Sequence, residues 1–112
     1  MDPKLYNLEQ IEIMAEGNNE FVMTMVNMFI ELTPDLVNKI KKGLLDGNYE
    51  EIKASAHKLK PSIDMMGIEL VKNEIREIEK LALEKADTYT LNNKIVYVEN
   101  ILNKVLEQLK SL

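Results

Sequence analysis

Apolar residues along this chain recur at spacings of three and four rather than two, which is typical of helices with one buried face. Leu, Met, Ile, Lys and Glu dominate nearly the whole length, and most of these favour helix. The pattern predicts five helices, over residues 7–15, 20–45, 48–66, 68–86 and 88–109. Because the last four are long and joined by short connections, we predict an all-α fold. Its form is an antiparallel up-and-down four-helix bundle with a short additional N-terminal helix.

The ends of the first three helices are marked by residues that suit those positions. Gly17 is a natural C-terminal glycine for the first helix, and Asn18 or Asn19 can cap the second. Asn48, followed three residues later by Glu51, predicts a reciprocal capping box at the start of the third helix.

The second predicted helix has two unusual features. Pro34 lies in its middle and, because proline lacks a backbone N–H, we expect the helix to bend or restart there. Its apolar face is also too wide for a simple surface helix. A second apolar stripe beside the main one comprises Phe21, Met25, Met28 and Leu32. This stripe is either ordinary bundle core or a partly exposed docking surface, for which methionine is well suited.

The length and composition narrow the class of protein. With 112 residues, we expect one domain spanning residues 1–112. The absence of cysteine is consistent with the cytoplasm, and no apolar run approaches the roughly 18 residues that would cross a membrane. A net charge of −5 opposes nucleic-acid binding. The charge is uneven, because the segment from Lys39 to Lys60 holds six lysines against three acidic residues.

Most catalytic chemistries are poorly supported by this sequence. With one histidine and no cysteine, neither a metal site of the usual composition nor a Ser-His-Asp hydrolase is convincing. Glycine-rich phosphate-binding loops are absent as well. We therefore expect no cofactor bound by this chain and no free-standing enzyme activity, and the third helix holds the remaining candidate chemistry.

The third predicted helix separates an inward seam from an outward strip. The seam comprises Ile52, Ala56, Leu59, Ile63 and Met66, at the spacing of a bundle helix. The outward strip comprises Lys53, His57, Lys60, Pro61 and Asp64. The only histidine is thus predicted to be exposed, with lysines within about one turn. An accessible ring nitrogen can act as a nucleophile, and the lysines would attract a phosphoryl group bound to it.

Residues 56–67, read as AHKLKPSIDMMG, resemble the signature of the histidine-containing phosphotransfer (HPt) domain. That signature is an Ala-His-x-Leu-Lys-Gly run with a second glycine ten residues after the histidine. The matching residues are Ala56, His57, Leu59, Lys60 and Gly67. The resemblance extends over the chain, since these domains are helical bundles of about this length.

The resemblance implies a phosphorelay carrier. His57 would accept a phosphoryl group from an aspartyl phosphate on a response-regulator receiver domain and pass it to another receiver. It further implies that Lys60 assists the phosphate and that Gly67 permits the turn into the next helix, while Lys53 could add electrostatic support. The receiver would supply Mg²⁺, a hybrid histidine kinase could be a further partner, and we expect a monomer.

Pro61 departs from the family pattern, which usually has glycine there. Proline leaves the His57 carbonyl without its helical donor and sets a pyrrolidine ring beside the imidazole. The simplest interpretation is a tolerated kink. The change could also restrict which receivers approach, or mark a degenerate HPt domain, a non-catalytic helical module that binds receivers without carrying phosphate.

Overall fold

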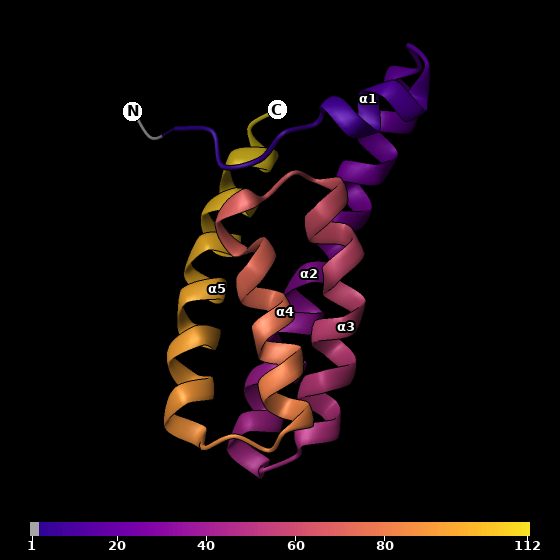
Figure 1. The fold of residues 1–112 in the computed structure, drawn as a ribbon. Coiled ribbons are helices and arrows are strands. Elements are labelled where there is room, and N and C mark those ends of the chain that lie inside the picture. Colours follow the sequence, from indigo (N-terminus) through magenta and orange to yellow (C-terminus); the bar gives the residue numbers. More distant parts are fainter. Residues whose placement is uncertain (1–2) are drawn as a thin grey trace.

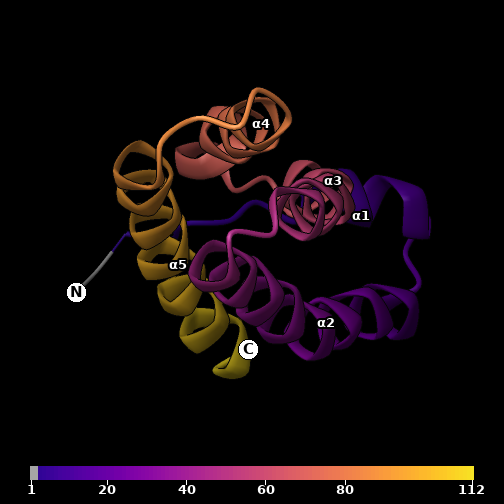
Figure 2. The same ribbon diagram turned by 90° about the horizontal axis from the view of Figure 1, so that it is seen from below.

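The structure is a computed structural model that describes residues 3–112, and it is all-helical over that range. Its five helices are α1 (Glu9–Ala15), α2 (Asn19–Asp46), α3 (Tyr49–Met65), α4 (Glu69–Leu83) and α5 (Thr88–Lys110). Helices α2 to α5 run alternately down and up, and α1 lies beside the N-terminal end of α2 (Figure 1). Viewed from below, the four long helices surround one core in the order α2, α3, α4, α5 (Figure 2). The predicted all-α bundle with an extra N-terminal helix is confirmed.

The buried side chains of all five helices form one apolar cluster. The predicted seam of α3 lies at its centre, since Ile52, Ala56, Leu59, Ile63 and Met66 are each at most 2% exposed. Burying an Ile, Leu or Met side chain contributes about 1.5–3 kcal/mol to the free energy of folding. The seam therefore fixes the rotation of α3 about its axis and turns the outward strip away from the core.

The predicted helix caps are formed, one of them only in part. The side-chain oxygen of Asn18 accepts from the Phe21 amide at 3.1 Å, and that of Asn48 accepts from the Glu51 amide at 3.1 Å. The reciprocal half of the capping box at α3 is absent. The Asn48 amide instead donates to the Gly43 carbonyl at 2.8 Å, at the end of α2.

Helix α2 does not restart at Pro34, which corrects one of the two outcomes expected there. It is a single helix from Asn19 to Asp46 with Pro34 inside it. Phe29 and Val37 are buried on either side of the proline, and Thr33 next to it is also buried. Burial of this face on both sides of Pro34 holds the helix together despite the missing backbone hydrogen bond.

Two apolar side chains of the helices α4 and α1 are exposed and do not join the core. Leu70 lies at the start of α4, where its neighbour Val71 occupies the core position. Met14 is exposed because α1 lies at the end of the bundle and buries only its Ile11 side.

The segment before α1 ties the end of the bundle together. The Leu5 amide donates to the Gln108 side chain at 2.9 Å, and the Asn7 amide donates to the Met66 carbonyl at 2.9 Å. Gly67 has a φ of 61°, and a Cβ built there would lie 2.8 Å from atoms of Asn7. Glycine at position 67 therefore allows both the turn between α3 and α4 and the close approach of the segment at Asn7.

Candidate functional site

His57 lies in the middle of α3 and faces solvent, with 68% of its side chain exposed. It takes this position because its neighbours Ala56 and Leu59 belong to the buried seam. The antiparallel α3–α4 hairpin brings α4 alongside the same flank of α3 (Figure 1). A side chain of α4 can therefore reach the imidazole.

That side chain is Glu79, and it binds two residues of the outward strip. Its Oε2 lies 2.7 Å from His57 Nδ1, and its Oε1 lies 2.7 Å from Lys60 Nζ. The Glu79 side chain is 22% exposed and that of Lys60 is 26% exposed, so both are partly shielded from water. One carboxylate thus links the histidine to the nearest lysine of the strip.

The charge state of Glu79 determines which imidazole nitrogen is free. The hydrogen bond from Lys60 is the main cause that lowers the pKa of Glu79, and His57 contributes in the same direction against the effect of burial. An ionised carboxylate only accepts hydrogen bonds, so Nδ1 of His57 carries the proton it donates to Glu79. In the neutral ring Nε2 then holds the lone pair, and among residues 3–112 only Glu79 hydrogen-bonds the ring. The site can therefore present Nε2 as a nucleophile.

Glu79 was not identified from the sequence, although a signal for it exists. In an antiparallel hairpin, residues about equally far from the turn lie side by side. His57 stands ten residues before Gly67 and Glu79 stands twelve residues after it. Counting outward from this glycine narrows the choice to Glu77 and Glu79, and only the structure shows that Glu79 is the one beside the histidine.

The remaining residues of the strip are placed differently from Lys60. Lys53 lies one turn before His57, but its ammonium contacts Glu50 at 3.3 Å, so the structure does not bring it onto the imidazole. Asp64 accepts from Arg76 of α4 at 3.1 Å, and Arg76 is the main cause that lowers the pKa of Asp64.

Pro61 is exposed and lies one turn after His57, as predicted. Helix α3 runs through it to Met65, so the helix accommodates the proline without ending there. Because Pro61 has no N–H, the His57 carbonyl has no helical donor at this point.

An apolar hollow of about 80 Å³ lies between α2 and the end of α3. The second stripe of α2 forms one side of it, with Met28 47% and Leu32 54% exposed. Ser62 and Met65 of α3 line the other side. Ser62 is five residues after His57, so the hollow begins about one and a half helical turns from His57, on the α2 side of the same helix.

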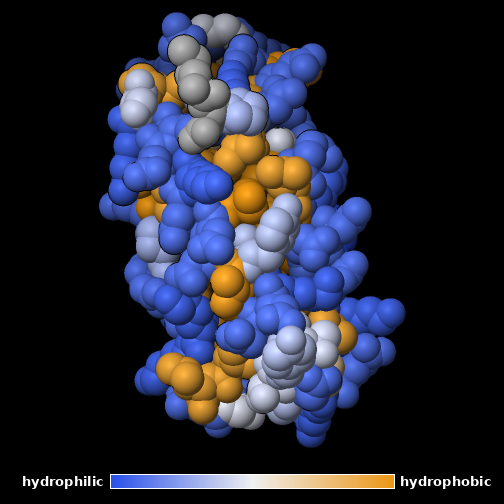
Figure 3. All heavy atoms as spheres, turned by 90° about the vertical axis from the view of Figure 1, so that its left-hand side faces the viewer, coloured by the Kyte–Doolittle hydropathy of each residue, from blue (hydrophilic) through white to orange (hydrophobic). Residues whose placement is uncertain are grey.

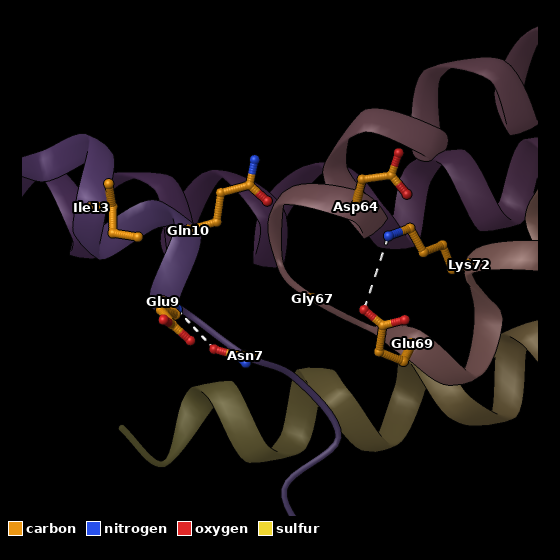
Figure 4. Close-up of a pocket in the computed structure, with 8 residues that line it drawn as sticks. All are labelled: Asn7, Glu9, Gln10, Ile13, Asp64, Gly67, Glu69 and Lys72. Atoms are coloured by element: carbon orange, nitrogen blue, oxygen red, sulfur yellow. Dashed lines mark hydrogen bonds and ion pairs between the residues drawn. The ribbon is translucent and has the colours of Figure 1, made fainter.

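Two of the further hollows lie where helices or turns meet, away from His57. One of about 160 Å³ lies between α2 and α5 and includes Leu45 and Val96. Figure 3 shows the α5 side of the molecule, where apolar residues reach the surface as a broken band between hydrophilic ones. The other, of about 290 Å³, lies where α1 meets the α3–α4 turn (Figure 4). There Lys72 pairs with Glu69 at 4.0 Å, so the polar groups of this hollow partly satisfy one another.

Within residues 3–112, no group of three or more His, Cys, Asp or Glu side chains is placed to hold a metal ion. No helix in that range is both long and apolar enough to cross a membrane.

A family model described as the Hpt domain matches residues 24–112. The match spans α3 with His57, the α3–α4 hairpin with Glu79, and most of α2. The chain belongs to the Hpt domain family, and it is accordingly a phosphotransfer-related module of two-component systems. The resemblance seen in residues 56–67 is thereby confirmed. A search of curated proteins and a search of solved structures find no match.

Proposed function

We propose that this protein is a phosphorelay carrier in which Nε2 of His57 accepts a phosphoryl group from the aspartyl phosphate of one receiver domain and passes it to another. The observation that carries the proposal is the exposed His57 ring with Nδ1 held by Glu79 at 2.7 Å. Such a ring has one nitrogen fixed and the other free, as a nucleophile requires. His57, Lys60 and Glu79 all come from one chain, which favours action as a monomer.

The transfer step requires little of this chain beyond holding the His57 ring and Lys60 in position. The Nε2 lone pair forms the N–P bond while the P–O bond to the receiver's aspartate breaks, and that electron pair leaves on the aspartate carboxylate. Alignment of the reacting atoms and neutralisation of charge on the transferring group dominate such steps. In this proposal the receiver supplies Mg²⁺ and the aspartate, and this chain supplies the imidazole and Lys60. The chain is a phosphocarrier without free-standing catalytic activity.

The apolar hollow beside α3 supports a receiver domain as the partner, whether free-standing or part of a hybrid histidine kinase. Met28 and Leu32 are large, exposed and next to the helix that carries His57. A partner that covers them also lies against the imidazole. Methionine adapts to different surfaces, which suits a carrier that must bind both a donor and an acceptor.

The test is incubation with a receiver domain that carries an aspartyl phosphate, followed by measurement of acid-labile, base-stable phosphate on this chain. We expect labelling of the wild type and none of the His57→Gln variant, whose helix content and thermal midpoint should match the wild type because His57 is exposed. Labelling that persists in His57→Gln would place the phosphoryl group elsewhere and refute the assignment.

Pro61 favours a second candidate function, a degenerate HPt domain that binds receivers without carrying phosphate. Pro61 lies one turn after His57 on α3, at the position where the family usually has glycine. The same experiment separates the two functions if receiver binding is measured in parallel. Binding without labelling in the wild type, together with labelling of Pro61→Gly, would support the degenerate module.

A further inference from the structure

Lys60 already has an anionic partner before any phosphoryl group arrives. Its ammonium lies 2.7 Å from Oε1 of Glu79, and the other oxygen of the same carboxylate holds His57 Nδ1. The cation suited to neutralise a phosphoryl group on His57 is therefore compensated in the resting protein. A phosphoryl group on Nε2 must compete with Glu79 for it.

Two further cations near the site, Lys53 of α3 and Arg76 of α4, are also paired. Lys53 contacts Glu50 at 3.3 Å, and Arg76 donates to Asp64 at 3.1 Å and to the Lys72 carbonyl at 2.8 Å. The lysines of the strip and Arg76 thus each contact a carboxylate of this chain. A phosphoryl group carries up to about two negative charges, so charge must be redistributed when it binds.

The attack itself creates a replacement partner for Glu79. When Nε2 forms the N–P bond, the ring keeps its Nδ1 proton and becomes a cation. The Nδ1–H of this cation points at Oε2 of Glu79, and a charge-assisted hydrogen bond is stronger than the neutral one that preceded it. Glu79 can then give up Lys60 without being left as an unpaired carboxylate.

We propose that phosphorylation exchanges the partners of Lys60: its ammonium moves from Glu79 to the phosphoryl group, while Glu79 pairs with the charged His57 ring. This inference rests on the proposed function. Glu79 acts here as a positioning residue that competes for Lys60. The competition limits how firmly Lys60 holds the phosphoryl group and so keeps the group transferable to the next receiver.

A double-mutant cycle tests whether Glu79 acts through Lys60. The chain is phosphorylated with phosphoramidate, a small donor with its own P–N bond, and the half-life of the phosphohistidine is measured after the donor is removed. The four proteins are wild type, Glu79→Gln, Lys60→Ala and the double variant. Gln keeps a hydrogen-bond acceptor for Nδ1 but has no charge to hold Lys60. Glu77→Gln is the matched control, because Glu77 lies on the same helix and pairs with Lys94, away from His57.

We expect Glu79→Gln to lengthen the half-life about two- to fivefold, the range set by a partly exposed ion pair. The lengthening should largely disappear in the Lys60→Ala background, where the ratio of the two half-lives should approach one, and Glu77→Gln should have no effect. An unchanged half-life in Glu79→Gln, or the same fold-change with and without Lys60, overturns the exchange. Failure of the wild type to take label from either phosphoramidate or a phosphorylated receiver would instead contradict the proposed function.

Discussion

A histidine ring has two nitrogens, and the proposed phosphocarrier function needs one of them free while the other is held. In this protein Oε2 of Glu79 holds Nδ1, and the ring is exposed with Nε2 free of any hydrogen bond from residues 3–112. Glu79 holds the His57 ring by a hydrogen bond and by its negative charge, and these two effects can be separated by substitution. Gln at this position keeps the first and removes the second.

The lowered pKa of Glu79 gives a testable pH dependence of stability. Because Lys60 and then His57 lower this pKa in the folded state, the folded protein binds the Glu79 proton less readily than the unfolded chain does. The resulting stabilisation is present above the ordinary carboxyl pKa of 4.5 and is lost as the pH falls through the lowered folded value. Glu79→Gln should therefore unfold at a lower temperature than the wild type at pH 7.

Thermal midpoints of the two proteins measured from pH 7 to pH 3 check this. The gap between them should narrow below the ordinary carboxyl pKa as Glu79 of the wild type becomes protonated. A gap that stays constant over the whole range would mean that the charge of Glu79 adds nothing to stability.

At the scale of single elements, the helices of this bundle could be predicted because their signals are local. The spacing of Ile52, Ala56 and Leu59 alone orients α3 and so exposes His57. At the start of α4 Leu70 is exposed and its neighbour Val71 is buried, and spacing alone does not decide which of two adjacent apolar residues is buried there. The two helical prolines show that tertiary burial can outweigh a local breaking signal.

Contacts between the helices, and between the helices and the N-terminal segment, could not be predicted from the sequence. Glu79 is one of many glutamates in an acidic chain, and only the packing of α3 against α4 distinguishes it. The passage of Asn7 beside Gly67 likewise joins segments far apart in the sequence. The glycine was predicted for its turn, whereas its second role depends on tertiary structure.

The two roles of Gly67 can be separated by comparison with Gly47. Both have positive φ, 61° and 67°, but a Cβ at Gly47 would meet nothing within 4 Å. Gly47→Ala should cost only the left-handed backbone penalty of about 1–2 kcal/mol. Gly67→Ala should cost more, because its Cβ also collides with Asn7. Denaturant unfolding of both variants measures the difference, and equal losses would mean that the segment at Asn7 moves aside freely.

At the scale of the whole molecule, the bundle places its chemistry and its apolar surface on adjoining flanks. His57 and Glu79 lie at the α3–α4 side, while Met28, Leu32 and Met65 line the hollow at the α2–α3 side. The helix α3 belongs to both flanks. A receiver that covers the hollow is thereby set against the imidazole, whereas one that bound the groove between α2 and α5 would lie on the opposite side of the bundle (Figure 2).

Substitution of Leu32 tests this arrangement, with Leu45 at the C-terminal end of the same helix as the matched control. Leu32 is 54% exposed beside the hollow, and Leu45 is 86% exposed in the groove between α2 and α5. Leu32→Ala should weaken receiver binding and slow transfer, because it removes apolar surface that the partner covers. Its cost in unfolding free energy should stay below the roughly 2–5 kcal/mol typical of a buried leucine. Leu45→Ala should leave binding unchanged.

Receiver affinity and unfolding free energy, both measured on each variant, distinguish docking from core packing. A large stability loss in Leu32→Ala with unaltered affinity would assign the second stripe to the core, and weakened binding in Leu45→Ala would move the docking surface to the α2–α5 side.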